Sequence, residues 1–270
     1  MSFLLAIDVG NTHVVLGVFH REELKARWRI TSDLNRTADE YGLELIALLA
    51  SENFPRQQID SIAICCVVPP LARVFAKIAA KYFGVHPFLV NADCDLGIIV
   101  ACDDPASVGP DRLVNAVAAT KFVGLPAIVV DFGTATTFDV IAADGSYQGG
   151  AIAPGINISA QALFHKAAML YSIELKKPTR AIGRNTKDSM LSGIVFGYVG
   201  LVDGIIARII DEMGVRPRVV ATGGLAAVVS SESQYIEEVI PDLTLKGLRI
   251  IASSRVASEN PDSLHESTLD

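Results

Sequence analysis

The chain has 270 residues, of which 50% are hydrophobic and 20% are charged, and its mean hydropathy is +0.39. This length predicts two modest domains or one large one, and the composition excludes a mainly disordered chain. The net charge of −7 and the pI of about 5.3 disfavour a nucleic-acid scaffold, whose affinity rests on basic contacts to phosphates.

The first half of the chain predicts alternating strands and helices. Apolar runs at 3–9, 14–19 and 25–31, joined by short turns, predict an antiparallel meander. The elements expected next are a helix over 38–52, a strand over 61–68, a helix over 70–83, a strand over 87–91 and, after a loop at 92–110, a helix over 111–122. This alternation favours an α/β protein.

The second half repeats the opening pattern. Residues 127–152 predict three strands joined by turns, followed by helices over 158–170 and 189–213 and, over 218–224, a strand that ends in a glycine-rich turn. The helix over 189–213 contains four glycines, which close packing against another helix would explain. We interpret 248–253 as a last strand and 254–270 as a flexible tail.

The cysteines and the N-terminus favour a cytoplasmic protein. The four cysteines form no CxxC pair, and we interpret them as buried, reduced thiols rather than zinc ligands or a disulfide. The N-terminal segment has no basic region and reaches Asp8 too early for a signal peptide. No run of 18 apolar residues occurs, so we expect no membrane span.

Two similar turns carry the strongest chemical signal. Asp8-Val9-Gly10-Asn11-Thr12 and Asp131-Phe132-Gly133-Thr134 each follow an apolar strand, and they are separated by nearly half the chain. Glycine allows a tight turn whose N–H groups can face an anion, and the carboxylates could hold cations. One such turn alone would be ordinary, but two at equivalent positions indicate a duplicated domain that binds a polyphosphate.

Other motifs are less specific by themselves. The sequence contains no GxxxxGK[ST], GxGxxG or GxSxG motif, and its histidines are scattered. Thr222-Gly223-Gly224 and the glycine-rich segment 149–155 could bring backbone close to a flat ligand. Asp111 and Arg112 could be a helix cap and a surface cation, or a general base and an anion-binding group.

Taken in order, these motifs resemble type III pantothenate kinases. The matching segments are DVGNT (8–12), GPDR (109–112), DFGTATT (131–137), GGAIAPG (149–155), RNTKDSMLSG (184–193) and TGG (222–224). The resemblance extends over about residues 5–250. It implies two duplicated ribonuclease-H-like domains of the actin-like ATPase fold, over 1–120 and 121–253, with a cleft between them.

The resemblance also implies a reaction and its site. ATP would phosphorylate pantothenate to 4'-phosphopantothenate, the first step of coenzyme A biosynthesis, in a homodimer that requires Mg²⁺ and K⁺ or NH4⁺. Asp111 would be the general base, Asp131 would bind the monovalent cation and Asp8 would bind magnesium through water. ATP would contact Asp8, Val9, Gly10, Asn11, Thr12, His13, Val14, Val15 and Thr134; pantothenate would contact Gly109, Pro110, Asp111, Arg112 and the neighbouring subunit's copy of Thr186.

The sequence departs from the family pattern at two positions. Pro110 stands where the family usually has a small residue, so one backbone donor is lost. Cys102 stands where a tyrosine is usual, which enlarges the expected pantothenate pocket. Two other functions compete with the kinase: a non-catalytic regulator of the same fold, similar to Bvg accessory factor, and an actin-like or Hsp70-like ATPase.

Overall fold

The computed structural model describes residues 3–166 and 172–259, which divide into two compact units. Of these residues, 3–97, 106–118 and 244–259 form the first unit, and 98–105, 119–166 and 172–243 form the second. The expected boundary at residue 120 thus falls near one of the points where the chain passes between units. However, the C-terminal helix groups with the first unit, although it is the last described element of the chain.

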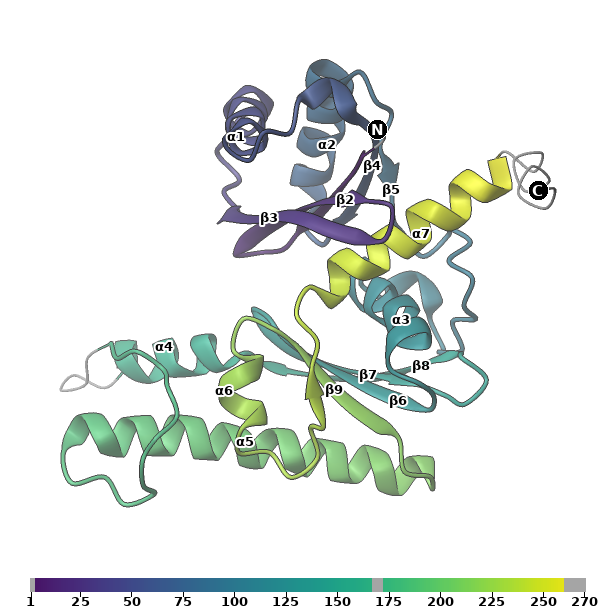
Figure 1. Ribbon diagram of the computed structural model, residues 1–270. Coiled ribbons are helices and arrows are strands. Elements are labelled where there is room, and N and C mark those ends of the chain that lie inside the picture. The colour runs from purple at the N-terminus through teal and green to yellow at the C-terminus, as the bar shows by residue number, and fades with distance from the viewer. Residues whose placement is uncertain (1–2, 167–171, 260–270) are drawn as a thin grey trace. The chain divides into compact units, whose positions relative to one another are not determined.

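The first unit contains a five-stranded mixed sheet with the strand order β3-β2-β1-β4-β5 (Figure 1). Its strands are β1 (Phe3–Val9), β2 (His13–His20), β3 (Glu23–Thr31), β4 (Ile59–Cys66) and β5 (Phe88–Leu89). The first three form the predicted antiparallel meander, and β4 pairs with β1 in parallel. The strands predicted in this half of the chain are therefore all confirmed, with small changes at their ends.

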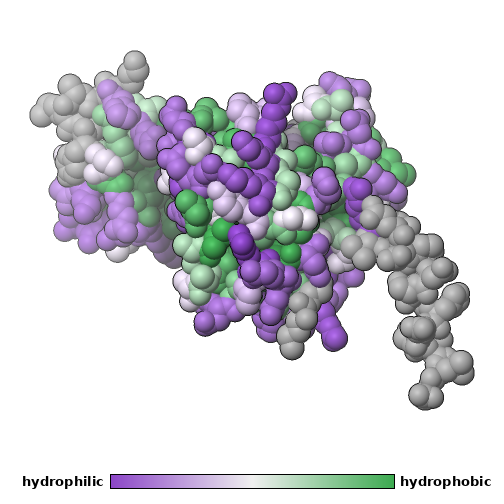
Figure 2. Space-filling model, turned by 90° about the horizontal axis from the view of Figure 1, so that it is seen from above, coloured by the Kyte–Doolittle hydropathy of each residue, from purple (hydrophilic) through white to green (hydrophobic). Residues whose placement is uncertain are grey.

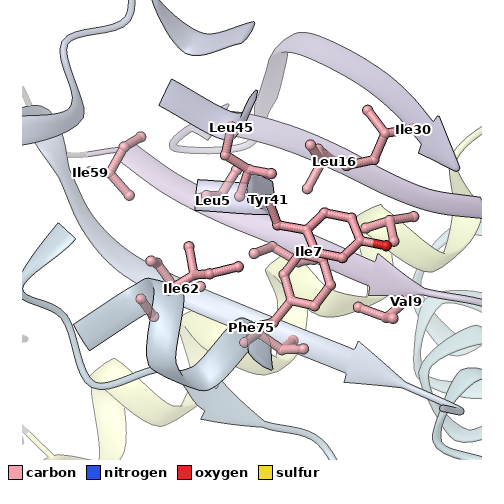
Figure 3. Close-up of a cluster of buried hydrophobic side chains, with 14 of the residues drawn as sticks. Leu5, Ile7, Val9, Leu16, Ile30, Tyr41, Leu45, Ile59, Ile62 and Phe75 are labelled. Atoms are coloured by element: carbon pink, nitrogen blue, oxygen red, sulfur yellow. The ribbon is translucent and has the colours of Figure 1, made fainter. Parts of the chain in front are cut away.

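Helices α1 (Ala38–Ser51) and α2 (Pro69–Ile78) cover one face of this sheet. Thr37 caps α1 through a capping box with Glu40, and prolines begin α2, as helix starts favour. A π-helical turn (Ala79–Phe83) continues α2 and ends at Gly84, which has the left-handed conformation that glycine adopts without strain. Tyr41 and Phe75, with aliphatic residues of the sheet, form the core between the layers (Figure 3).

The second unit repeats this topology. Its sheet has the order β10-β9-β6-β7-β8, formed by β6 (Ala127–Phe132), β7 (Ala135–Ile141), β8 (Tyr147–Pro154), β9 (Arg218–Gly223) and β10 (Glu238–Val239). Strands β6, β7 and β8 form an antiparallel meander, and β9 pairs with β6 in parallel. Because β6–β10 reproduce the pairing of β1–β5, the duplication predicted from the two turns is confirmed.

The helices of the second half include one clear correction. The described helices there are α4 (Ile156–Lys166), α5 (Thr186–Met213), α6 (Ala226–Ser230) and α7 (Leu243–Glu259). Residues 248–253, predicted as a strand, lie inside α7, which also removes 254–259 from the predicted tail. The apolar stretch is too short to distinguish a strand from a helix, and in the structure the segment packs closely on helix α3 (Pro110–Phe122), where a Cβ at Gly247 would clash with the Val114 backbone. The rest of the predicted tail lies outside the described residues.

Helix α5 is long and apolar enough to cross a membrane by length and composition. One such helix is weak evidence, because a core helix passes the same test. Here Tyr198, Val202 and Ile206 of α5 are buried in the core of the second unit. The face of the molecule drawn in Figure 2 carries hydrophobic residues in small groups among hydrophilic ones.

Candidate functional site

The first candidate phosphate loop joins β1 and β2 in the first unit. Asp8 is half-buried on β1, where its register partners are Val15 on β2 and Cys65 on β4. The loop itself contains Gly10, Asn11 and Thr12, and the Gly10 N–H donates to the His13 carbonyl at 3.0 Å. Asn11, Thr12 and His13 are exposed, whereas Val9 and Val14 are buried in the core. The loop therefore presents polar groups from a rigid apolar base.

The pKa of His13 in this loop is lowered. Partial burial of the imidazole is the larger cause, and the positive charge of Arg29 adds to it. Arg29 lies on β3 opposite Val15, so its guanidinium group adds positive charge to the region of the first loop. Phosphate binding would benefit from this charge.

The second candidate loop joins β6 and β7 in the second unit. Asp131 is half-buried on β6, and its register partners are two threonines, Thr137 and Thr222. The loop is one residue shorter than the first, and the Gly133 N–H donates to the Ala135 carbonyl at 3.0 Å. Directly after β8, the Gly155 N–H donates to the Thr134 carbonyl at 3.1 Å.

Two glycines are required beside this second loop. A Cβ at Gly155 would clash with the Thr134 carbonyl oxygen. Gly223 has a φ of +94°, and its Cβ would lie 2.7 Å from Asp131 Oδ1 and 2.6 Å from the Phe132 carbonyl oxygen. Of the weaker glycine motifs, TGG thus has a defined role, because Gly223 leaves room for the Asp131 carboxylate.

Asp111 lies in the first turn of α3, in the first unit. Its Oδ1 accepts a hydrogen bond from the Arg112 N–H at 2.9 Å, and a Cβ at Gly109 would lie 2.6 Å from the same oxygen. Burial raises the pKa of Asp111, and this effect exceeds the lowering by the Arg112 N–H and by the Arg112 charge. A carboxylate with a raised pKa is a stronger base, as proton removal from a hydroxyl requires.

The positions around Asp111 explain the local sequence. Pro110 is the first residue of α3, where the missing N–H breaks no helical hydrogen bond. The Gly109 carbonyl instead accepts from the N–H groups of Arg112 and Leu113, at 3.1 and 3.3 Å. The proline that departs from the family pattern is therefore compatible with the helix start that places Asp111.

Thr186 is the exposed first residue of α5, after the capping residue Asn185. The helix residue that contacts the second loop region is Tyr198, whose hydroxyl bonds to Thr136 Oγ1 at 2.5 Å and to the Pro154 carbonyl at 2.9 Å. Tyr198 lies twelve residues after Thr186, or about 18 Å along a helix. Within its own unit, Thr186 is thus far from the phosphate loop. Tyr198 carries no sequence signal of this contact, because a tyrosine on an apolar helix face resembles any core residue.

The glycines of α5 do not pack as expected. Gly193, Gly197 and Gly200 are exposed, and a Cβ added at any of them would meet no described atom within 4 Å. The predicted packing against another helix is therefore absent from the described part of this chain. These glycines follow one another at spacings of four and three residues, so they form a single exposed ridge.

The cation candidates differ in their surroundings. No group of three or more His, Cys, Asp or Glu side chains that could hold a metal occurs among the described residues. Asp131 has threonine neighbours on both adjacent strands, and oxygen ligands are those that hard cations prefer. Asp8 has no such neighbours in its register row. The residues around Asp131 therefore fit a cation that binds oxygen. All four cysteines lie in the described part of the chain, and none of them forms a disulfide. The prediction that they are buried is correct for Cys65 alone, because Cys66 ends β4 and Cys94 and Cys102 lie in loop segments, where they are half-buried.

Comparison with known proteins agrees with these features. Residues 4–208 match a family model described as type III pantothenate kinase. A type III pantothenate kinase of Roseiflexus sp. (strain RS-1) is 50% identical over 248 residues, covering 92% of this chain and 97% of the relative.

Solved structures agree with the fold alone. A putative 2-dehydro-3-deoxygalactonokinase from Sinorhizobium meliloti aligns with a TM-score of 0.58 at 15% identity, covering 99% of this chain and 100% of that one. A ROK hexokinase from Thermus thermophilus aligns with a TM-score of 0.52 at 12% identity, covering 95% and 99%. Together with the repeated topology, these alignments confirm the predicted pair of ribonuclease-H-like α/β domains.

Proposed function

Because the chain belongs to the type III pantothenate kinase family and phosphorylates pantothenate in coenzyme A biosynthesis, we propose the role of each site residue in that reaction. The observation that carries the proposal is the Asp111 carboxylate, buried enough to raise its pKa and held at the start of α3. ATP is the phosphate donor, as the kinase family implies.

Asp111 acts as the general base. It accepts the proton of the pantothenate primary hydroxyl as the hydroxyl oxygen attacks the γ-phosphorus of ATP in line with the departing ADP oxygen. Its Oδ1 is engaged by the Arg112 N–H, which fixes the carboxylate while the second oxygen can accept the proton. Arg112 pairs with the carboxylate of pantothenate, a role that suits a planar guanidinium group.

The two loops bind the phosphates of ATP. In the first unit, Asn11 and Thr12 supply backbone N–H groups and their amide and hydroxyl side chains, because the Gly10 N–H donates to the His13 carbonyl and the remainder of the segment Asp8–Val15 is paired within the sheet. In the second unit, Thr134 supplies a further hydroxyl. The exposure of Asn11 and Thr12 above a buried base supports this assignment.

Cations neutralise the charge of the phosphates. Asp131, with Thr137 and Thr222 beside it, would hold K⁺ or NH4⁺, and Asp8 would bind Mg²⁺ through water. When bound, these cations reduce the repulsion between the phosphates and the attacking oxygen. The proposed roles of Asp111 and of the backbone N–H groups are the same whichever monovalent cation is bound.

The active form is a cytoplasmic homodimer in which the α5 glycine ridges of two subunits pack together. Gly193, Gly197 and Gly200 leave space for a close approach of a second helix. Thr186 is far from the phosphate loop of its own unit, so it acts on pantothenate bound by the neighbouring subunit.

A mixing experiment tests the shared site. Asp111→Asn and Thr186→Ala proteins are each impaired alone. After random exchange of subunits, about a quarter of all sites would combine an intact Asp111 with an intact Thr186, and activity should recover accordingly. Without recovery, despite exchange shown by differently tagged subunits, the shared-site assignment is wrong.

The first experiment measures ADP release with ATP, Mg²⁺ and pantothenate, in K⁺ and then in Na⁺. Dependence on both pantothenate and K⁺ supports the substrate and cation assignments. ATP hydrolysis without pantothenate would instead favour an ATPase, and absence of turnover with any cation would favour a regulatory protein of the same fold.

A further inference from the structure

A buried tyrosine outside the proposed site is connected to the first phosphate loop by hydrogen bonds. Tyr41 lies on α1, has no exposed surface and packs its ring against Phe75 at a centroid distance of 5.1 Å. Its hydroxyl group is the side-chain oxygen visible at the edge of the core cluster in Figure 3. A phenylalanine would fill this space equally well, so the hydroxyl group needs a separate explanation.

The hydroxyl binds the backbone on both sides of Ser32. It accepts from the Asp33 N–H at 2.7 Å, and its proton is within reach of the carbonyl oxygens of Asp33 at 3.1 Å and Thr31 at 3.3 Å. The segment just after β3 is thus fixed by one side chain from α1.

Ser32 transmits this constraint to the loop. Its N–H donates to the Thr12 carbonyl at 3.0 Å, beyond the last β2–β3 register pair of His13 and Thr31. The carbonyl of Thr31 and the N–H of Ser32 belong to the same planar peptide group. The orientation of that peptide, which Tyr41 helps to set, therefore determines where the Thr12 carbonyl is held.

Further contacts restrain the ring of Tyr41 and the start of its helix. The Arg36 guanidinium lies 4.3 Å from the centroid of the Tyr41 ring, and Arg36 Nη1 pairs with Glu44 at 2.5 Å. Thr37 caps α1 through its capping box, so the first turn of the helix is fixed as well. These contacts leave the hydroxyl little freedom to follow a moving loop.

We propose that Tyr41 is a positioning residue for ATP, whose hydroxyl fixes the Thr12 end of the first phosphate loop through the Thr31–Ser32 peptide group. This inference rests on the proposed role of the loop in phosphate binding. Tyr41 does not contact ATP itself. Without the hydroxyl, the loop samples geometries in which its N–H groups no longer converge on the phosphates, so ATP binding weakens while the pantothenate site is unchanged.

The test compares Tyr41→Phe with a matched core variant, Leu49→Ala. Leu49 lies on the same helix and is buried in the same core, but two turns further from the loop. Both variants should be less stable than the parent protein, because one loses buried hydrogen bonds and the other leaves a cavity. Only Tyr41→Phe should raise KM for ATP, about 5- to 10-fold, with KM for pantothenate changed less than 2-fold. Hydrogen exchange at the Ser32 amide should accelerate in Tyr41→Phe more than in Leu49→Ala.

A third variant, Asp8→Asn, alters the loop segment directly. It distinguishes failure of the positioning role of Tyr41 from failure of the proposed role of the loop in binding ATP. If Asp8→Asn raises KM for ATP but Tyr41→Phe does not, or if Leu49→Ala raises it equally, the positioning role of Tyr41 is wrong while the loop assignment survives. If Asp8→Asn leaves both KM and kcat unchanged, the proposed role of the loop fails, and the inference fails with it.

Discussion

Gly10–Thr12 in the first unit and Gly133–Thr134 in the second join the first two strands of equivalent sheets, and the same hydrogen bond holds both loops. The residue after the third strand of each meander donates its N–H to the carbonyl of the last loop residue, Ser32 to Thr12 and Gly155 to Thr134. A tyrosine hydroxyl binds the carbonyl at the end of each third strand, but Tyr41 comes from the 14-residue helix α1 and Tyr198 from the 28-residue helix α5. Duplication has therefore kept the anchor together with the strand pattern, whereas the helices that support the anchor differ.

The carboxylates before the loops have different neighbours in the two units. Asp8 lies in a row with Val15 and Cys65, and Asp131 lies in a row with Thr137 and Thr222. Side chains in one row of a sheet point to the same face. Only the second row offers hydroxyl oxygens around the carboxylate, which supports different cation roles for the two halves.

The largest effect concerns Asp111, which belongs to the first unit. Asp111→Asn should lower kcat about 10²- to 10⁴-fold, the usual contribution of a general base, while ATP still binds. Steady-state kinetics measures the loss of kcat, and ATP titration measures the retained binding of ATP. An active Asp111→Asn enzyme would contradict the assignment of the base.

The pH dependence should report the same group. Because burial raises the pKa of Asp111, activity should fall on the acid side at a pH above that expected for an ordinary aspartate. A raised pKa in the folded state also means that the stability contributed by this group is lost as the pH rises through that pKa. Asp111→Asn should therefore be more stable than the parent at neutral pH, as thermal unfolding at pH 5 and pH 8 can measure.

Two glycines beside the loops, Gly155 and Gly10, should differ in their tolerance of a methyl group. Gly155→Ala would press a Cβ into the Thr134 carbonyl, whereas at Gly10 the nearest atom, the His13 carbonyl oxygen, would be 3.1 Å away. We expect Gly155→Ala to cost about 1–3 kcal/mol of unfolding free energy and Gly10→Ala less, measured by denaturant titration. Equal costs would mean that the close contact of Gly155 with the Thr134 carbonyl is not what requires a glycine there.

The strand neighbours of Asp131 and those of Asp8 should contribute differently to the dependence of activity on K⁺. Thr222→Val removes one hydroxyl beside Asp131 at nearly constant volume, and we expect the K⁺ concentration for half-maximal activity to rise several-fold. Cys65→Val is the matched change beside Asp8 and should leave the K⁺ dependence unchanged. A shift in the Cys65 variant alone would reverse the assignment of the two carboxylates.

The smallest effect concerns the helix that anchors the first loop. Thr37→Ala removes the N-cap of α1 and should cost about 1 kcal/mol of stability. Since Tyr41 is held by its core contacts as well, KM for ATP should change less than in Tyr41→Phe. Urea denaturation and ATP kinetics on the same samples test both statements.

The sequence was sufficient to predict the strands that carry the loops, since apolar runs ending in Asp-x-Gly mark both of them. It was insufficient for α7, where a short apolar stretch suits a strand or a helix and only its packing against Val114 distinguishes them. The internal duplication would have predicted α7 as a helix. In the first half, helix α3 follows β5, the last strand of the first sheet, and α7 takes the same place after β10.

Tyr41 and Tyr198 were also beyond prediction from the sequence. Each is a tyrosine on an apolar helix face, and each is significant only through what its hydroxyl reaches after folding. The roles of Asp111, Arg112 and Thr186 came from motif resemblance. Their residue types alone were equally compatible with a helix cap and surface groups.

The placement of α7 has a consequence for synthesis on the ribosome. Leu245 of α7 packs beside Gly17 of β2, and Gly247 packs against Val114 of α3. The first unit, although it is begun first, therefore lacks part of its packing until the whole of the second unit has been translated. The second unit can close as soon as residue 243 has emerged. The nascent chain should thus complete its later half before its earlier one, and an exposed sheet face on the N-terminal half is a natural substrate for chaperones during that interval.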